Sequence, residues 1–402
     1  TKAKIFCAAD SKYRFWINGR YAGFGPARGH PEHPYYDTYT VNLNKGENVI
    51  AFLVEHYTDP TTIFAPVEGG LICQIITADG LILTTDNSWK AKTADAYSPL
   101  PNCLFPECFD ANLEPENWET SDFDDTGWNN AVEKINTKLA PVTNLIPRPI
   151  PLLTEKLLLP QRILHIYKNV KETNDFLDKE KICETLWSAK QLEINKNALT
   201  PEIKPPCKWQ NNICLDILPN EGICIMLDFG FETLSAIEIC AESVSGIIID
   251  LGYSECLWSN KVATLWQSGA VLQGERIILR HGRTLHRINQ PRGFRYLLIR
   301  IFNPLKEKCR VILKSVTGYE EIYPAKQMGM FRCPDKVFED IYNLSARTVN
   351  LCMEDSYTDC PWRERSQWIG DSQPEALFNY YCFGIYDMSK KAILEFTQGN
   401  TP

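Results

Sequence analysis

Residues 355–371 read DSYTDCPWRERSQWIGD, and this stretch guides the interpretation of the rest of the sequence. It mixes carboxylates, arginines and aromatic side chains, namely Asp355, Asp359, Glu364, Asp371, Arg363, Arg365, Tyr357, Trp362 and Trp368. Pro361 argues against a helical turn at this point, because proline fixes φ and has no backbone N–H. Gly370 predicts a flexible joint before Asp371. Such a mixture is typical of a pocket wall rather than a packed core.

The stretch is flanked by segments with helical periodicity. From Pro334 onward, apolar or small residues recur at helical spacing at positions 337/338, 341, 344, 348 and 351/352, with Pro334 near the first helical position. Residues 374–383 and 387–396 predict two further helices. A helical domain therefore begins near residue 334.

The first 132 residues predict β-structure. Residues 13–17 lead into Asn18-Gly19, the strongest short signal for a hairpin, and residues 20–23 leave it. A second hairpin-like unit is predicted from residues 41–43 and the apolar strand at 49–54, and another strand at 71–76 follows. The spacing predicts a jelly-roll-like sandwich. Residues 118–128 are expected to form a corner that closes it.

The remaining sequence divides into a connector and a second β-rich part. Residues 141–207 carry repeated prolines, which predict an extended connector with a few strands. Strand patterns return at 224–228, 236–240, 246–250, 275–279 and 294–301. We therefore expect a β-sandwich domain at 1–140, a connector at 141–210, a second β-sandwich at 211–325, and a helical domain at 326–402.

Composition narrows the function classes. The 402 residues are 44% apolar and 23% charged, with a net charge of −8, and basic clusters are absent, which argues against a nucleic-acid partner. No apolar run approaches the ~18 residues of a membrane span, so a soluble protein is expected. None of the fifteen cysteines falls in a CxxC pair, and many lie in strand-like runs. No metal or other cofactor is predicted, and Cys103 and Cys108 could form a bridge or flank a loop.

Carboxylates beside arginines and aromatic rings are what sugar hydrolysis requires. One carboxyl donates a proton to the leaving oxygen, another activates water or attacks, and aromatic faces hold the apolar side of the sugar. Asp359, Glu364 and Asp371 are the candidates. An alternative from the same residue types is an ion network that caps helices at a domain junction, and residue types alone leave both open.

The spaced polar positions of Asp359-Cys360-Pro361-x-Arg363-Glu364-Arg365-x-x-Trp368-x-Gly370-Asp371 resemble the active-site signature of the α-L-rhamnosidases of glycoside hydrolase family 78. Those enzymes are (α/α)6 barrels preceded by β-sandwich domains. Residues 16–37, with Asn18-Gly19, residues 25–28 and residues 35–37, also look like the family's N-terminal module. The fold expected from this resemblance is multidomain, with two jelly-roll-like β-sandwich domains and the start of an all-α (α/α)6 barrel.

The resemblance implies an inverting hydrolase that releases terminal α-L-rhamnose from glycosides or polysaccharides. Glu364 matches the general acid, Asp359, Arg363 and Asp371 match residues that hold the rhamnose hydroxyls, and Trp368 would form a wall of the pocket. No residue matches the general base, which the family places later in the barrel. We therefore expect an incomplete enzyme without hydrolase activity of its own. The family's habit is export to the periplasm or the exterior, whereas the unpaired cysteines favour the cytoplasm.

Two other functions stay open. One is a non-catalytic carbohydrate-binding protein, and the other is a barrel glycosidase with a different sugar, because the bulky Trp362 could reshape the pocket. The loop with His30, Glu32 and His33 is interpreted as an exposed Pro-rich loop rather than a metal or sugar site. Trp118 and Trp128 are expected to fill the edge of a sandwich. A basic turn is expected to be solvated, and it consists of Arg280, His281, Arg283, His286 and Arg287.

Overall fold

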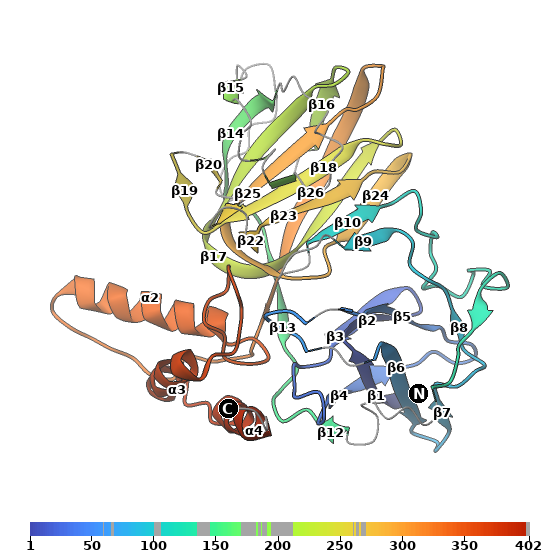
Figure 1. Ribbon diagram of the computed structural model, residues 1–402, viewed down its shortest axis with the longest axis vertical. Coiled ribbons are helices and arrows are strands. Elements are labelled where there is room, and N and C mark those ends of the chain that lie inside the picture. Colours follow the sequence, from blue (N-terminus) through green and yellow to red (C-terminus); the bar gives the residue numbers. More distant parts are fainter. Residues whose placement is uncertain are drawn as a thin grey trace.

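The computed structural model of the 402-residue chain places strands in two groups and helices at the C-terminal end (Figure 1). It describes residues 1–58, 60–65, 68–99, 106–134, 145–169, 182–183, 186, 191–193, 212–259, 261–262, 265–266 and 271–398. The N-terminal strands and the helices both lie below the large sheet in Figure 1, on opposite sides of the connection that leads into it. The described chain is mostly β, in agreement with β-sandwich domains.

The N-terminal strands form two sheets that pack face to face, and we call them the N-terminal module. One sheet has the order β12 (Ile146–Pro147), β4 (Tyr35–Asn42), β1 (Lys2–Asp10), β6 (Gly70–Thr77) and β7 (Ile82–Thr84), and the other has the order β3 (Arg20–Gly25), β2 (Lys12–Ile17) and β5 (Ile50–Glu55). Alternate residues of β1 point inward, where Ile5 and Cys7 meet Phe15 of the other sheet in one buried cluster. A sandwich core results.

One predicted hairpin of this module is confirmed and the other is wrong. Asn18 and Gly19 connect β2 to β3 with φ of 51° and 73°, as a two-residue turn with positive φ requires. The strands around residues 41–54 do not pair with each other: β4 pairs with β1, and β5 pairs with β2. The chain crosses between the two sheets here because both strands bury apolar faces in the same core.

The second group of strands is one large sheet. Its main order is β13 (Thr154–Leu158), β26 (Cys309–Ile322), β17 (Gly222–Ser243), β25 (Arg292–Phe302), β18 (Ile248–Ser254), β23 (Gly274–Ile278), β10 (Glu107–Asp110) and β9 (Tyr97–Pro99). β14 (Arg162–Asn169), β15 (Gln191–Glu193), β16 (Ile213–Ile217) and β24 (Gly282–Arg287) pair outside that path. Strands from β16 to β26 contribute to one buried apolar cluster, so this sheet encloses a core of its own.

Two features of the large sheet differ from the sequence pattern. The strands predicted at 224–228 and 236–240 are one element, β17, whose pairing with β25 shifts between Asp228 and Thr233 around Gly230 at a φ of 86°. In addition, β9 and β10 join this sheet although they precede residue 132 in the chain. The domain boundaries at 140, 210 and 325 stay a prediction.

Short strand pairs complete the β-structure. They are β8 (Lys90–Ala91) with β11 (Asn129–Asn130), β19 (Leu257–Trp258) with β20 (Lys261–Val262), and β21 (Leu265–Trp266) with β22 (Val271–Leu272). Cys103 lies outside the described residues, so its pairing with Cys108 is not tested.

The helices are α2 (Lys336–Cys352), α3 (Ile369–Cys382) and α4 (Asp387–Gln398). Asp335 caps α2 by accepting a hydrogen bond from the N–H of Val337 at 3.0 Å. The predicted start of α3 at residue 374 is wrong, because the helix begins at Ile369 and contains Pro374. Gly370 therefore lies in the first helical turn and is not a flexible joint. No helix in the described ranges is long and apolar enough to span a membrane.

The apolar face predicted for α2 is exposed. Val337, Phe338, Ile341 and Leu344 are each more than half exposed, and α4 exposes Ile393. The same face is buried only at the C-terminal end of α2, at Leu351 and Cys352. Exposed apolar faces of this kind mark contact surfaces.

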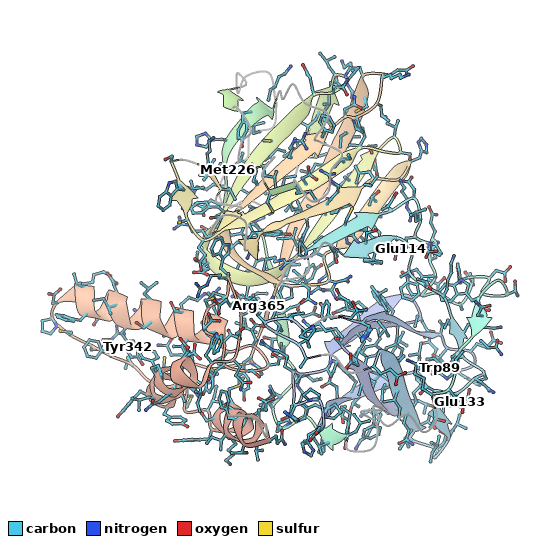
Figure 2. The ribbon with its side chains drawn as sticks, viewed as in Figure 1. Trp89, Glu114, Glu133, Met226, Tyr342 and Arg365 are labelled. Carbon is cyan, nitrogen blue, oxygen red and sulfur yellow. The ribbon has the colours of Figure 1, made fainter. Side chains whose placement is uncertain are left out.

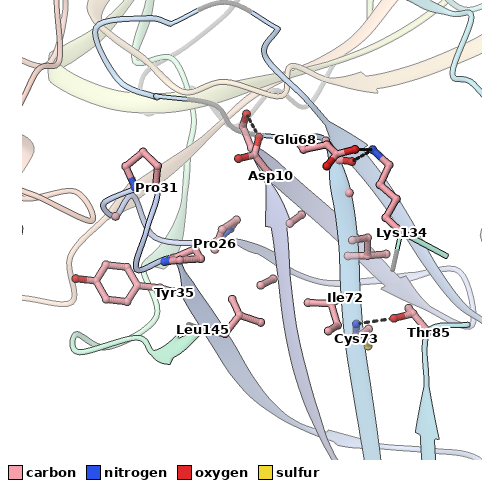
Figure 3. A pocket seen from close by; sticks show the side chains of 18 of the residues that line it. Asp10, Pro26, Pro31, Tyr35, Glu68, Ile72, Cys73, Thr85, Lys134 and Leu145 are labelled. Carbon is pink, nitrogen blue, oxygen red and sulfur yellow. Dashed lines mark hydrogen bonds and ion pairs between the residues drawn. The ribbon is translucent and has the colours of Figure 1, made fainter. Parts of the chain in front are cut away.

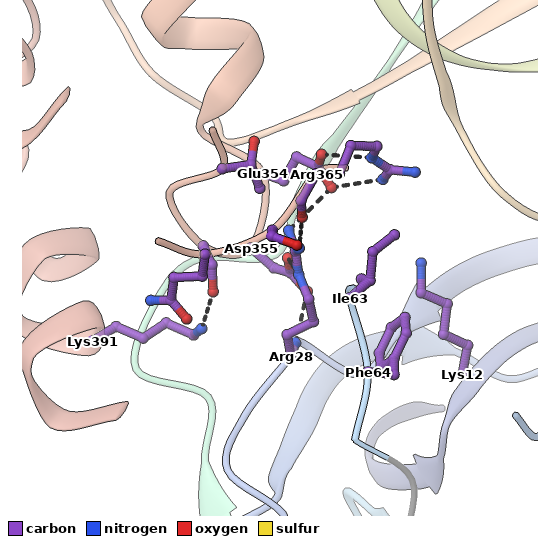
Figure 4. Close-up of polar contacts among 12 residues, drawn as sticks. Lys12, Arg28, Ile63, Phe64, Glu354, Asp355, Arg365 and Lys391 are labelled. Carbon is purple, nitrogen blue, oxygen red and sulfur yellow. Dashed lines mark hydrogen bonds and ion pairs between the residues drawn. The ribbon is translucent and has the colours of Figure 1, made fainter. Parts of the chain in front are cut away.

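Buried charges join the N-terminal module, the helical segment and the large sheet (Figure 4). Arg28 Nε donates to Asp355 Oδ1 at 2.6 Å, and the Arg28 backbone N–H donates to Asp355 Oδ2 at 2.6 Å. Arg365 makes a two-pronged contact with Glu354, at 2.9 and 2.7 Å, and donates to the carbonyl of Pro291 at 2.8 Å. We call Arg28, Glu354, Asp355 and Arg365 the junction network, and Figure 2 shows Arg365 where the three parts meet.

The junction network favours the ionised form of Asp355. Burial raises the pKa of Asp355, but the positive charges of Arg28, Lys391 and Lys12 outweigh burial and hold that pKa below its usual value. The stability of the folded chain depends on these partners, because the loss of one would leave the buried charge of Asp355 without compensation.

Replacement of Arg28 by Met is expected to destabilise the chain by about 3–5 kcal/mol, the typical cost of removing one partner of a buried ion pair. Chemical denaturation of the 402-residue polypeptide measures the change in the free energy of unfolding. Arg20→Met, at an exposed position, is the control and should change the stability by less than about 0.5 kcal/mol. Equal stabilities of the two variants would contradict the role of the junction network.

Candidate active site

The candidate residues lie in the loop between α2 and α3 and in the first turn of α3. This loop rests directly on β25 of the large sheet. A Cβ added to Gly293 would lie 2.3 Å from the carbonyl oxygen of Pro361, so only glycine allows this approach. Gln273 donates to the carbonyl of Trp362. The loop is therefore held by the sheet beneath it.

Trp362 does not line an open surface. Its side chain is 7% exposed, and its backbone is held at Gln273. The sequence left open that this indole reshapes a sugar pocket. Its burial favours a packing role between the loop and the large sheet.

Asp359 closes the loop on itself. The Asp359 N–H donates to the carbonyl of Ser366 at 3.0 Å, and the Ser366 N–H donates to Asp359 Oδ1 at 2.9 Å. Cys360 Sγ lies 3.3 Å from Asp359 Oδ2, and Arg363 lies 3.7 Å from the same oxygen. Asp359 is thus a nearly buried carboxylate with one oxygen fixed by backbone and the other beside a guanidinium.

Glu364 has the more accessible carboxyl group. Its side chain is 30% exposed, and Oε1 lies 3.2 Å from the guanidinium of Arg363. Oε2 accepts a hydrogen bond from the indole N–H of Trp368 at 3.0 Å. The Trp368 side chain is itself 53% exposed. The carboxyl group is therefore oriented from two sides while it stays open to a ligand.

These contacts bring four of the five predicted site residues together. Asp359, Arg363, Glu364 and Trp368 form one connected group, through Arg363 and through the indole of Trp368. Asp371 follows Trp368 by one helical turn and is exposed in the first turn of α3. Among the described contacts, no hydrogen bond or ion pair joins its side chain to the other four.

Sequence reasoning missed Glu375. It lies one turn after Asp371 on α3, and its Oε2 is buried with no hydrogen-bond partner among the described residues. Burial raises the pKa of Glu375 to about 8, with further increases from Asp371 and Asp359 and a small opposing contribution from Cys352. The signal was the four-residue spacing from Asp371, which becomes visible only when the helix begins at Ile369.

Other candidate residues from the sequence make contacts within their own parts of the chain. Trp118 packs edge-on against Trp16, with ring centroids 5.2 Å apart, which agrees with a filling role. His30 Nδ1 accepts from the N–H of Glu32 at 3.3 Å within its own loop. The described ranges contain no cluster of three or more His, Cys, Asp or Glu side chains that could hold a metal ion.

The basic turn predicted to be solvated is solvated only in part: His281 and Arg283 are exposed, whereas His286 is buried. His286 stacks on Phe109 at 3.7 Å between centroids and contacts Glu107 at 2.7 Å. Arg287 pairs with Glu155 and Glu321. These contacts are formed because β24 pairs with β17 in the large sheet, beside β9 and β10, a tertiary arrangement that spacing alone does not reveal.

A cavity lies in the N-terminal module (Figure 3). It has a volume of about 480 Å³ and is lined by β1, β6, the loop around Pro31, and residues 131–134 and Leu145. An ion pair between Glu68 and Lys134, 2.9 Å apart, lies at its edge. Its lining includes none of residues 355–371.

Comparisons with known proteins identify the family. A family model described as the α-L-rhamnosidase N-terminal domain matches residues 1–151, and one described as the bacterial α-L-rhamnosidase six-hairpin glycosidase domain matches residues 326–401. The chain is an α-L-rhamnosidase-like protein of glycoside hydrolase family 78. The family resemblance of the sequence motif is thus confirmed.

Relatives of this α-L-rhamnosidase-like chain are distant in sequence. An α-L-rhamnosidase of Formosa agariphila is 21% identical over 421 residues, covering 97% of this chain and 37% of that protein. The family 78 rhamnosidase structure of Bacillus sp. GL1 superposes with a TM-score of 0.81 at 21% identity, covering 98% of this chain and 59% of that one. The Streptomyces avermitilis α-L-rhamnosidase in complex with L-rhamnose gives 0.67 at 19% identity, over 100% and 35% of the two chains. The α-L-rhamnosidase-like chain therefore spans less than two thirds of these relatives.

Glu375→Gln is expected to flatten the pH dependence of stability in the α-L-rhamnosidase-like chain. The pKa of Glu375 is raised from 4.5 to about 8, so the folded state holds a proton that the unfolded chain releases in this interval. This contribution to stability is complete below pH 4.5 and is lost as the pH rises through 8. Glutamine cannot lose that proton. Urea denaturation at acidic, neutral and alkaline pH measures the difference.

The control for this prediction is Glu47→Gln, at an exposed position in the N-terminal module. It should keep the wild-type pH dependence. If Glu375→Gln and wild type lose stability in parallel as the pH rises, Glu375 is not protonated in the folded chain at neutral pH.

Proposed function

We propose that this chain carries the acid and the sugar-binding residues of an inverting α-L-rhamnosidase. Glu364 is the general acid, Asp359, Arg363 and Asp371 hold the rhamnose hydroxyls, and Trp368 forms a wall of the pocket. The substrate is a terminal α-L-rhamnose of a glycoside or polysaccharide. The motif resemblance and the two family matches support this proposal.

The observation that carries the proposal is the orientation of Glu364. Its carboxyl group and the Trp368 side chain are both accessible. One carboxyl oxygen accepts a hydrogen bond from the indole N–H of Trp368, and the other lies beside the guanidinium of Arg363. A general acid must reach the leaving oxygen from a fixed position, and an exposed indole face suits the apolar side of a sugar. Asp359 and Arg363 supply the charged groups that hold hydroxyls through charge-assisted hydrogen bonds.

Glycoside cleavage with inversion needs a second carboxylate. Glu364 would protonate the glycosidic oxygen while a base removes a proton from water on the opposite face of the sugar, with the two carboxyls ~6.5–9.5 Å apart. No residue of this chain matches the family's base. We therefore propose that the 402-residue polypeptide by itself does not turn over rhamnosides.

We also propose that α2, α3 and α4 are the first helices of an (α/α)6 barrel. The six-hairpin domain match over residues 326–401 supports this assignment. The exposed apolar side chains of Val337, Ile341, Leu377 and Ile393 support it as well, since barrel helices bury such faces against further helices.

Glu364→Gln in the full-length gene product is expected to lower kcat on an alkyl α-L-rhamnoside by about 10²–10⁴-fold, the usual contribution of a general acid. NMR of the released sugar should show the β-anomer first, as inversion requires. Glu307→Gln, at an exposed position, is the matched control and should retain wild-type rates. A folded wild-type protein inert on rhamnosides would refute the substrate and favour a barrel glycosidase for another sugar.

Asp359→Asn and Asp371→Asn are expected to weaken L-rhamnose binding by roughly ten- to a hundredfold, since each removes hydrogen bonds to a charged group worth about 1.5–3 kcal/mol. Calorimetric titration of the purified variants measures this, with Asp340→Asn on the exposed face of α2 as the control. Sugar affinity that survives removal of all residues after Pro334 would instead favour a non-catalytic carbohydrate-binding protein.

A further inference from the structure

Three successive residues of the motif are held by the N-terminal module. Thr62 Oγ1 donates to the carbonyl of Glu364 at 2.8 Å, and the Ser366 hydroxyl donates to the carbonyl of Thr62 at 2.8 Å. Between them, the carbonyl of Arg365 accepts from Arg28 at 2.7 Å. Thr62 and Glu364 are 302 positions apart in the chain. The module therefore contacts the backbone on both sides of Arg365.

Arg365 has an unusual backbone conformation, and this makes the contacts important. Its φ is 54°, in the left-handed region that a non-glycine residue rarely adopts and that costs of order 1–3 kcal/mol when the surroundings impose it. The side chain is fixed by Glu354 and by the carbonyl of Pro291. The bonds from Thr62 Oγ1 to the Glu364 carbonyl and from Arg28 to the Arg365 carbonyl fix the two peptide units that flank this residue, and the Ser366 hydroxyl adds a side-chain bond to Thr62.

The turn that presents Thr62 is itself well anchored. Thr61 Oγ1 accepts from the N–H groups of Ile63 and Phe64 at 2.9 and 2.8 Å. The Phe64 ring packs against Tyr57 at 5.3 Å between centroids and lies beneath the ammonium of Lys12. Figure 4 shows Ile63 and Phe64 beside the junction network. Thr62 is therefore held on a fixed support rather than on a loose loop.

The carboxyl group of Glu364 is less constrained than its backbone. Its contacts are the indole of Trp368 and the guanidinium of Arg363, and both of these side chains are substantially exposed. The position of the carboxyl group hence depends on where the backbone of Glu364 is held. A shift of about 1 Å in a catalytic group is enough to lower a rate by about a hundredfold.

We propose that Thr62 of the N-terminal module is a positioning residue for the general acid Glu364, so that the β-sandwich is a working part of the active site. This inference rests on the proposed function. Thr62 acts through the backbone of the acid and does not contact substrate. Its effect should therefore be confined to the step that needs a proton.

The test compares leaving groups in the full-length gene product. When the glycosidic bond of an alkyl α-L-rhamnoside breaks, the alcohol leaves only if its oxygen receives a proton, whereas dinitrophenol leaves as the phenolate anion and hardly needs the acid. Thr62→Val, which removes the hydroxyl and keeps the shape, is expected to lower kcat on the alkyl substrate by about tenfold or more, with KM nearly unchanged. The rate on the dinitrophenyl substrate should stay close to wild type, and Thr62→Ser should restore the alkyl rate.

Two further variants keep the test decisive. Thr120→Val is the control in the same module, since the Thr120 hydroxyl bonds to Asn117 within its own turn. Ser366→Ala removes the other hydrogen bond of the pair without altering the module, and it should reproduce the leaving-group effect if Thr62→Val does not fold. Equal losses on both substrates, or unchanged alkyl rates in the folded variants, would overturn the proposal.

A measurement without turnover separates this inference from the proposed function. In the 402-residue polypeptide, the indole N–H resonance of Trp368 reports its hydrogen bond to Glu364. Thr62→Val should shift this NMR resonance, and Thr62→Ser and Thr120→Val should not. If the full-length wild type hydrolyses no rhamnoside, the proposed function fails. The NMR resonance of Trp368 then decides by itself whether Thr62 positions Glu364. An unshifted resonance in Thr62→Val overturns it.

Discussion

The buried guanidinium of Arg28 is the interaction on which the arrangement of the three parts depends. Its Nε donates to Asp355, its other two nitrogens donate to Glu354 and to the carbonyl of Arg365, and the backbone N–H of Arg28 adds a second bond to Asp355. Lysine could not make these directed contacts with one ammonium group. Because each partner is buried, the network is stable only when the N-terminal module and the helical segment are docked together.

The loop that carries the candidate acid is consequently built as an interface. The large sheet approaches it at Gly293 and Gln273, and the N-terminal module approaches it at Thr62. The loop has little secondary structure of its own to hold the left-handed residue Arg365. Its geometry is set by contacts with residues distant in sequence, so the β-structure contributes to chemistry as well as to stability.

Carboxyl groups of different character lie in the loop before α3 and in its first two turns. Asp359 is nearly buried and paired with backbone, Glu364 is accessible beside an indole, and Asp371 is exposed. Burial, with further contributions from Asp371 and Asp359, raises the pKa of Glu375 to about 8. A raised pKa favours the neutral form of Glu375, which lowers the charge repulsion among neighbouring carboxyl groups.

The sequence by itself determined the local features of this protein. The Asn18-Gly19 hairpin and the helices around the motif were predicted from residue types and spacing, which report interactions between near neighbours. Residue types also made Asp359, Glu364 and Asp371 candidates, and the resemblance to a family motif added Arg363 and Trp368. The tertiary structure decided that the strands around 41–54 lie in different sheets, that α3 begins at Ile369, and that Trp362 is buried. It also brought Thr62 and Arg28 to the motif. Contacts across some three hundred residues leave no periodic signal, because they depend on how whole sheets pack.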